Sequence, residues 1–301
     1  MNSLTLLVDA SSLLYRAYYS TPASMRAPDG QSVNAAHGFM NMLARLVVDH
    51  DPARLALATD QDWRPAWRVD LIPAYKAARV EPGEPQATAD SEVARQSVLC
   101  FELLAGLGVV VIGHRGYEAE DVIGTLAERS RLAGTTPVGI VSGDRDLFQL
   151  VRDPDVFVFY PVKGVTELAR IDEAEITRRY GIPGRSYADY AVLRGDPSDG
   201  LPGVKGIGDK TASALLARYG SLAEIVRTAG EGAGAGPLSR VAGQLDYVDR
   251  AAQVVRIPLD LPLPELDLSR SRAQPRPEVA ARADSEGLGG AFGRLAVALC
   301  S

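Results

Sequence analysis

A chain of 301 residues with 46% hydrophobic and 23% charged residues has the composition of an ordinary globular protein, and it is long enough for one large or two smaller domains. Two cysteines are too few for a disulfide framework or a cysteine-based metal site. The first apolar run, which starts at Leu4, is too short for a signal peptide or a membrane span, so we expect a cytoplasmic protein without membrane contact.

The net charge of −6 argues against a nucleic-acid partner only if the acidic residues are spread over the surface. Nine of the 38 acidic residues fall into the motifs described below, and leaving them out changes the net charge from −6 to +3. The sign of the charge on the remaining surface is therefore open.

Short apolar runs alternate with helical patterns in the first half of the chain. The runs predict strands at 4–10, 54–60, 107–113, 137–144 and 156–161, and the segments between them predict helices at 35–49, 91–107 and 118–132. Most runs are continuously apolar, which is typical of strands buried on both faces. This alternation predicts an α/β domain with a mainly parallel sheet.

Acidic residues follow several of the predicted strands, where the carboxyl ends of parallel strands form the ligand-binding edge. Others lie at the start of a predicted helix, in GYEAEDVIGTLA, and in GDPSDG. The nine candidates are Asp9, Asp60, Glu118, Glu120, Asp121, Asp144, Asp146, Asp196 and Asp199. Two bare charges about 4 Å apart repel by roughly 4 kcal/mol at an effective dielectric near 20. If these groups converge, they need cations, and ligand sets made only of oxygen favour Mg²⁺ or Mn²⁺.

The plain alternative for the helix-start acids is that they complement the helix dipole. The spacing favours a shared site for two of them, because Glu118 and Asp121 are three residues apart and lie on one face of the helix. Glu120 lies on another face and needs its longer side chain to reach the same acidic edge.

The segment 63–79 carries a net charge of +3 and predicts a helix that Pro73 kinks. Lys76 and Arg79 are three apart and share a face, and Arg68 lies roughly on that face eight residues earlier. A polar, proline-containing stretch over 80–92 follows and is expected to be mobile. We interpret the region of about 63–95 as a lid or arch over the acidic edge; a solvated charged helix is the alternative.

From about residue 171 the pattern becomes helical, with a glycine-rich loop at 230–236 and a last weak amphipathic segment at 288–299. Within this half, GVKGIGDKTASALL offers glycine turns followed by a helix start, which together form an anion site of backbone N–H groups. The candidate DNA-binding residues are Gly203, Lys205, Gly206, Gly208, Lys210 and Thr211. They are suited to contact with a phosphate backbone, and a simple connection between two helices is the alternative.

Five motifs together resemble the structure-specific 5′ nucleases, which include flap endonucleases and the 5′-nuclease domain of bacterial DNA polymerase I. They are VDASSLLYRAYY, LIPAYKAAR, GYEAEDVIGTLA, SGDRDLFQLV and GDPSDGLPGVKGIGDKTA. The resemblance implies a PIN-like nuclease core over 1–170 with a helical arch. Over 171–301 it implies a helical region with a helix–three-turn–helix (helix-hairpin-helix) DNA-binding element that completes the metal site, and then a C-terminal tail. No polymerase portion follows, so the chain resembles a free-standing 5′ nuclease.

The resemblance also implies roles for residues. The nine carboxylates correspond to metal ligands, Lys76 and Arg79 to arch residues that contact the scissile phosphate, and Arg68 is a further catalytic candidate. The turn 203–208 corresponds to a segment that holds duplex DNA, in some members through a K⁺ ion. The implied activity is two-metal-ion hydrolysis of DNA as a 5′-flap endonuclease and 5′-3′ exonuclease in replication and repair.

The implied substrates are DNA with a 5′ flap, nick, gap or 5′ overhang, bound by a monomer. A sliding clamp or polymerase partner is left open. The chain departs from the family at Glu120, where Asp is usual, at Gly200, where Asn is frequent, and at the arch tip over 80–89. Two rival interpretations remain: a PIN-type ribonuclease, and a DNA junction-binding protein without catalysis.

Overall fold

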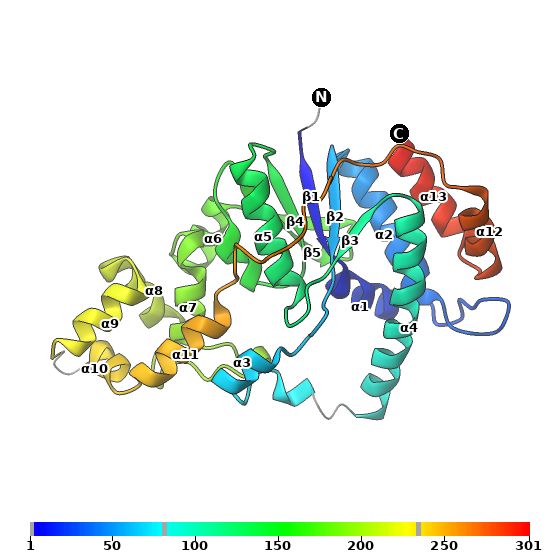
Figure 1. The fold of residues 1–301 in the computed structure, drawn as a ribbon. Helices are drawn as coiled ribbons and strands as arrows, with labels where there is room; N and C mark the ends of the chain where they lie inside the picture. Colours follow the sequence, from blue (N-terminus) through cyan, green and yellow to red (C-terminus); the bar gives the residue numbers. More distant parts are fainter. Residues whose placement is uncertain (1–2, 80–82, 233–235) are drawn as a thin grey trace.

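A six-stranded sheet forms the centre of the protein, whose computed structural model describes residues 3–79, 83–232 and 236–301 (Figure 1). The strands are β1 (Thr5–Asp9), β2 (Arg54–Ala58), β3 (Val110–Ile112), β4 (Val138–Val141), β5 (Val156–Lys163) and β6 (Glu167–Ile171). Their order is β3-β2-β1-β4-β5-β6, with every neighbouring pair parallel except β5–β6. The prediction of a mainly parallel α/β sheet is confirmed. β6, which was not predicted, is a short and partly polar strand at the edge of the sheet.

Successive residues of the central strands enter two separate hydrophobic cores, as the period of two in a strand requires. Leu6 and Val8 of β1 pack with α1 (Ala10–Ser20), α2 (Asn34–His50) and α13 (Gly289–Cys300). Leu7 faces the other side and packs with α5 (Ala119–Leu132). Helices therefore cover both faces of the sheet. The carboxyl ends of the parallel strands β1 to β5 all lie at the same edge, the lower one in Figure 1.

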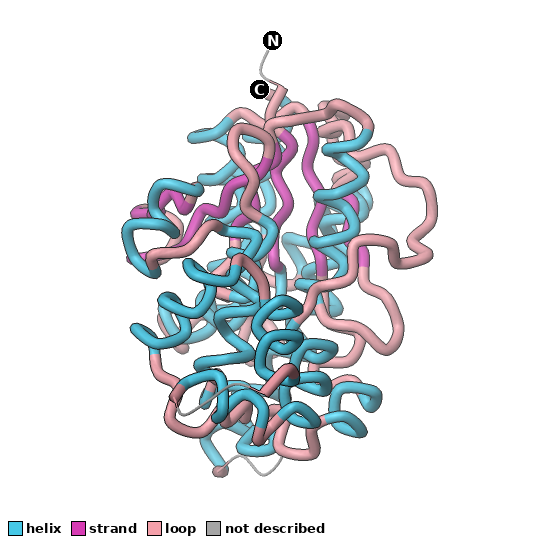
Figure 2. The backbone as a smooth tube through the Cα atoms, turned by 90° about the vertical axis from the view of Figure 1, so that its left-hand side faces the viewer, coloured by secondary structure: helices cyan, strands magenta, loops and turns pink. Residues whose placement is uncertain are grey.

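The second half of the chain is helical, as predicted. It contains α6 (Glu173–Tyr180), α7 (Tyr187–Arg194), α8 (Asp209–Tyr219), α9 (Leu222–Gly230), α10 (Pro237–Ala242) and α11 (Leu245–Val255). Helices α8 to α11 gather beside the sheet layer (Figures 1 and 2). In the glycine-rich loop predicted over 230–236, residues 233–235 lie outside the described part of the chain.

The last part of the chain returns to the sheet. Leu55 N–H donates to Leu268 O at 2.8 Å, next to a β-bridge between Arg54 and Ser269. The chain then forms α12 (Pro277–Ser285) and α13, and α13 packs along α2 (Figure 1). The C-terminal part of the chain is thus packed against β2 and α2 of the first half. No helix in the described ranges has both the length and the apolar character that a membrane crossing requires.

The region between β2 and β3 differs in part from its prediction. It consists of α3 (Ala66–Leu71), a short 3₁₀ turn (Ala77–Arg79) and the long helix α4 (Glu84–Gly106). Residues 84–92 were expected to be irregular but form the first turns of α4, whereas 80–82 lie outside the described residues. Hydroxyl groups of α1 explain the early start of α4, because Tyr15 donates to Asp90 and Tyr18 donates to Glu92, each at 2.8 Å.

Candidate metal centre

A cavity of about 950 Å³ opens at the carboxyl edge of the sheet. Five of the nine predicted carboxylates line it, together with two of the predicted basic residues: Asp9, Asp60, Glu118, Glu120, Asp144, Lys76 and Arg79. These residues come from several separate segments of sequence. Their meeting follows from the parallel topology, because β1, β2 and β4 all end at this edge.

Asp9 and Asp60 are tied to the protein on one side of the cavity. Asp9 ends β1 and caps α1, accepting from Ser12 N–H at 2.9 Å and from the Ser142 hydroxyl at 2.6 Å. Asp60 accepts from Ala119 N–H at 2.8 Å. Burial, followed by the neighbouring charge of Asp60, raises the pKa of Asp9 to about 7.

Glu120, Asp144 and Asp146 form a tight group of carboxylates, in which each offers an oxygen within 4.8 Å of the others. The turn after β4 brings the two aspartates together, since Asp146 N–H donates to Asp144 Oδ1 at 2.8 Å. Burial and then the charge of Asp144 hold the pKa of Glu120 and of Asp146 well above the usual range. Three oxygen donors that repel one another fit a hard divalent cation such as Mg²⁺ or Mn²⁺.

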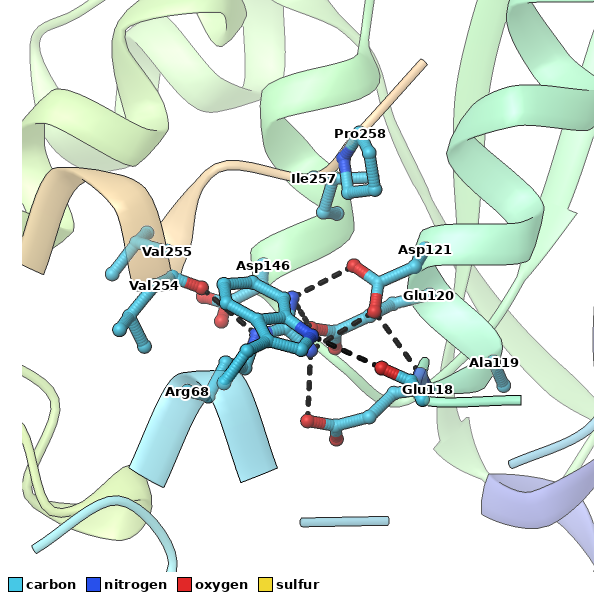
Figure 3. A network of polar contacts seen from close by, with 12 residues as sticks. Arg68, Glu118, Ala119, Glu120, Asp121, Asp146, Val254, Val255, Ile257 and Pro258 are labelled. Atoms are coloured by element: carbon cyan, nitrogen blue, oxygen red, sulfur yellow. Dashed lines mark hydrogen bonds and ion pairs between the residues drawn. The ribbon is translucent and has the colours of Figure 1, made fainter. Parts of the chain in front are cut away.

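Arg68 lies beside this group, 3.4 Å from Glu120, and its side chain is fully buried. Figure 3 shows it among Glu118, Glu120 and Asp121. Arg68 donates to Asp121 Oδ1 at 2.7 Å and Oδ2 at 3.0 Å, to Glu118 Oε1 at 2.8 Å and to Val254 O at 3.1 Å. Asp121 Oδ2 also accepts from Glu118 N–H at 3.0 Å, which closes a capping box at the start of α5. Both oxygens of Asp121 are therefore engaged within the protein.

This arrangement differs from what the sequence suggested for two residues. We expected Asp121 to bind cations directly, but it is not in the group of Glu120, Asp144 and Asp146 and is turned toward Arg68 instead. We expected Arg68 on the basic face of the arch, where a substrate could reach it, but no part of its side chain is exposed. Its guanidinium instead holds the carboxylates of Glu118 and Asp121.

Lys76 and Arg79 both reach the acidic residues. The ammonium of Lys76, 5% exposed as a residue, is ion-paired with Glu118, and Arg79 Nη2 lies 2.8 Å from Asp199 Oδ1. The Tyr75 hydroxyl donates to Glu118 Oε1 at 2.6 Å. Tyr75 was not singled out from the sequence, although it lies inside the LIPAYKAAR motif, so its position beside Lys76 was the available signal.

Asp196 and Asp199 lie in one 3₁₀ turn (Pro197–Asp199) beside the cavity. Asp196 caps the turn, accepts from Ser198 N–H at 2.9 Å and is half-buried. Asp199 is buried, and burial raises its pKa. The charges of both aspartates add to the rise in the pKa of Asp146, so these two carboxylates from the second half of the chain lie near the group of Glu120, Asp144 and Asp146 without being part of it.

The glycine turn precedes α8, which begins at Asp209 with Gly208 as its cap. Side chains from beyond residue 239 hold it: Gly203 N–H donates to the Tyr247 hydroxyl at 2.9 Å, Lys205 N–H donates to Gln244 Oε1 at 3.3 Å, and Arg240 donates to Gly206 O at 2.5 Å.

Two of the N–H groups expected to be free, those of Gly203 and Lys205, are therefore bonded within the protein. The N–H groups of the four other predicted residues (Gly206, Gly208, Lys210 and Thr211) have no acceptor in the described ranges and remain available to an anion. The side chains of Lys205 and Lys210 are exposed beside them.

Comparison with protein families gives two consecutive matches. Residues 4–181 match the model for the 5′-3′ exonuclease N-terminal resolvase-like domain, and residues 182–277 match the model for the 5′-3′ exonuclease C-terminal SAM fold. Two similar relatives are named 5′-3′ exonuclease. The protein from Streptomyces coelicolor is 47% identical over 273 residues, covering 86% of this chain and 87% of its own. The protein from Mycobacterium tuberculosis is 43% identical over 277 residues, covering 87% and 86%.

Among solved structures, the bacteriophage T5 flap endonuclease in a complex with DNA and metal ions has a similar fold. The TM-score is 0.69 at 15% identity, over 99% of this chain and 100% of that one. At this identity the likeness concerns the fold.

Proposed function

The chain belongs to the 5′-3′ exonuclease family, and from this membership we propose that it is a structure-specific 5′ nuclease that hydrolyses DNA phosphodiesters in replication and repair. The observation that carries the proposal is the group of Glu120, Asp144 and Asp146, with oxygens within 4.8 Å of one another at the same cavity as Lys76 and Arg79. The proposed substrates are DNA with a 5′ flap, nick, gap or 5′ overhang.

We propose that two or more Mg²⁺ or Mn²⁺ ions bind at this cavity. Glu120, Asp144 and Asp146 would hold them directly, with Asp199 and Glu118 beside them and Asp9, Asp60 and Asp196 as outer groups. Asp121 would act through Arg68, which keeps Glu118 and Glu120 in place. Bound divalent ions supply Lewis acidity to the attacking and leaving oxygens of an in-line displacement.

The basic residues of the arch would stabilise the charge that develops on the phosphate. Arg79 has a side chain 50% exposed and can turn from Asp199 to a phosphate that enters the cavity. Lys76 is buried beside Glu118, where the nearby carboxylates keep it protonated. A protonated amine held at the cavity wall is suited to a phosphate oxygen rather than to proton abstraction.

We propose that duplex DNA binds at the glycine turn, with phosphates near the free N–H groups of Gly206 and Gly208 and the side chains of Lys205 and Lys210. The K⁺ ion implied by the resemblance is not part of this proposal. The carbonyls of Val204 and Gly206 already accept hydrogen bonds, from Ile207 N–H and from Arg240, so a cation at the turn would share these two oxygens with protein donors.

Residues 1–170 would then form the nuclease core, and the helical part of 171–301 would hold the DNA and complete the metal site. We propose a monomer that acts on cytoplasmic DNA. A clamp or polymerase as an additional partner would have to be sought by binding experiments.

Cleavage of a 5′-labelled flap duplex with Mg²⁺ or Mn²⁺ tests the proposed function. The wild type should release the flap, Asp144→Ala should not, and Asp246→Ala, which changes an exposed aspartate paired with Arg250, should act as the wild type does. Equal cutting by Asp144→Ala would refute the mechanism. Preference for an RNA flap in a parallel reaction would favour a ribonuclease, and tight binding without cutting would favour a junction-binding protein.

A further inference from the structure

Gly200 makes an unusually close backbone contact with the arch segment. Its φ is +75°, a conformation that side chains with a Cβ rarely adopt. A Cβ at this position would lie 2.0 Å from Ala74 O, far inside the contact distance of the two atoms. The position therefore has no room for any side chain while Ala74 stays where it is.

This contact brings the turn at 196–200 against the segment that carries Lys76 and Arg79. Lys76 N–H donates to Asp199 O at 3.0 Å, and Arg79 lies 2.8 Å from Asp199 Oδ1. Lys76 itself has a φ of +48°. A left-handed conformation costs a residue with a Cβ roughly 1–2 kcal/mol, so the neighbouring contacts must hold it there.

The segment is also fixed from its other side. Arg64 donates to Tyr75 O at 2.6 Å and to Pro73 O at 2.9 Å, and the Tyr75 hydroxyl donates to Glu118. These bonds end at Tyr75. Beyond that residue, the backbone hydrogen bond to Asp199 sets the direction in which the chain continues and places the Lys76 ammonium against Glu118.

We propose that Gly200 is a positioning residue, whose missing side chain lets the segment 73–79 dock on the turn 196–200 so that Lys76 and Arg79 are in place at the carboxylates before DNA binds. This inference rests on the proposed function for its effect on cleavage. Its structural part, the docked state of residues 73–79, can be tested without any activity.

The test compares Gly200→Asn with Gly164→Asn. Asn, which is frequent at this position in the family, tolerates a left-handed backbone, but in this chain it adds the Cβ that Ala74 O excludes. Gly164 has a φ of +55°, and no atom lies within 4 Å of the place that its Cβ would take, so its variant introduces the same strain without the contact. Limited trypsin digestion of the full chain should cut after Lys76 about tenfold faster in Gly200→Asn than in the wild type or in Gly164→Asn, because release of the segment exposes a bond that docking protects.

Single-turnover cleavage of the flap duplex gives the functional result. Gly200→Asn should lower the rate about tenfold or more, as expected when a catalytic group is misplaced, while DNA affinity in EDTA stays within about twofold. In a background that carries both Lys76→Ala and Arg79→Ala, the same change should cost little more, because Gly200 acts through these two residues.

Unchanged digestion after Lys76 in Gly200→Asn would overturn the inference, as would unchanged turnover. Losses that multiply when Lys76→Ala and Arg79→Ala are already present would also overturn it. If Gly200→Asn does not fold by circular dichroism, Gly200→Ala adds the same Cβ with the smallest side chain, and wild-type digestion of that variant would also overturn it. A wild type that cuts no DNA would refute the proposed function, while the digestion experiment would still decide the docking.

Discussion

Replacing Arg68 with methionine removes a guanidinium that contacts three carboxylates beside the candidate metal centre. Arg68 lies 2.8 Å from Glu118, 3.4 Å from Glu120 and 2.7 Å from Asp121, and its side chain is fully buried. Methionine keeps much of the volume but leaves the acids without their counter-charge. Breaking a buried ion pair by removing one partner costs about 3–5 kcal/mol.

Thermal unfolding measures this loss. At about 2.1 cal/mol/K per residue, unfolding 301 residues carries an entropy near 0.6 kcal/mol/K, so the melting temperature should fall by about 5–8 °C. Arg178→Met is the control, because the Arg178 side chain is 68% exposed and its pair with Glu175 is a surface one. Surface pairs contribute about 0–1 kcal/mol. A loss for Arg68→Met no larger than that of Arg178→Met would refute the view that Arg68 neutralises this group.

Three further predictions concern the acids and the glycine turn. Because the folded pKa of Asp9 is raised from 3.8 to about 7, its contribution to stability is fully present below pH 3.8 and is lost as the pH rises through 7, by up to about 4 kcal/mol. Urea denaturation in EDTA at pH 5 and pH 8 should show this fall, Asp9→Asn should reduce it, and Mg²⁺ should reverse it; a metal-free protein equally stable at both values would contradict the prediction. Glu120→Asp should raise the Mg²⁺ concentration for half-maximal cleavage several-fold, since the shorter side chain draws its carboxylate away from Asp144 and Asp146, and an unchanged Mg²⁺ dependence would show that Glu120 is not a ligand. Arg240→Ala should weaken duplex binding about threefold to tenfold, because it removes both a positive charge and the contact with Gly206 O. Arg227→Ala is the control and should not weaken binding, because the Arg227 guanidinium is paired with Glu224 and Glu231. Equal losses of affinity for the two variants would mean that only the total charge matters.

The sheet and its acidic edge could be predicted because both depend on local patterns. The runs around Leu6 and Ile140 are apolar on both faces; the first strand ends at Asp9, and Asp144 follows the end of the second by three residues. Parallel strands bring such ends together whatever the remaining side chains are. For this reason Asp9 and Asp144 could be assigned to one edge from the sequence alone.

The contacts that decide which of these acids face the cavity and which bind protein groups could not be predicted, since they join residues far apart in sequence. Arg68 is 53 residues from Asp121 and 186 from Val254, and no periodicity relates them. The same holds for Tyr247, whose hydroxyl accepts a hydrogen bond from Gly203 N–H. Helix α4 starts early because Tyr15 anchors Asp90, again through a side chain from another helix.

Diffraction from crystals soaked in Mn²⁺ tests the central claim most directly, because the anomalous signal locates the ion. Our account predicts Mn²⁺ within about 2.5 Å of carboxylate oxygens of Glu120, Asp144 and Asp146, the range of bonds between oxygen and divalent metals. Mn²⁺ bound only at other places, with these three carboxylates free of metal, would contradict it.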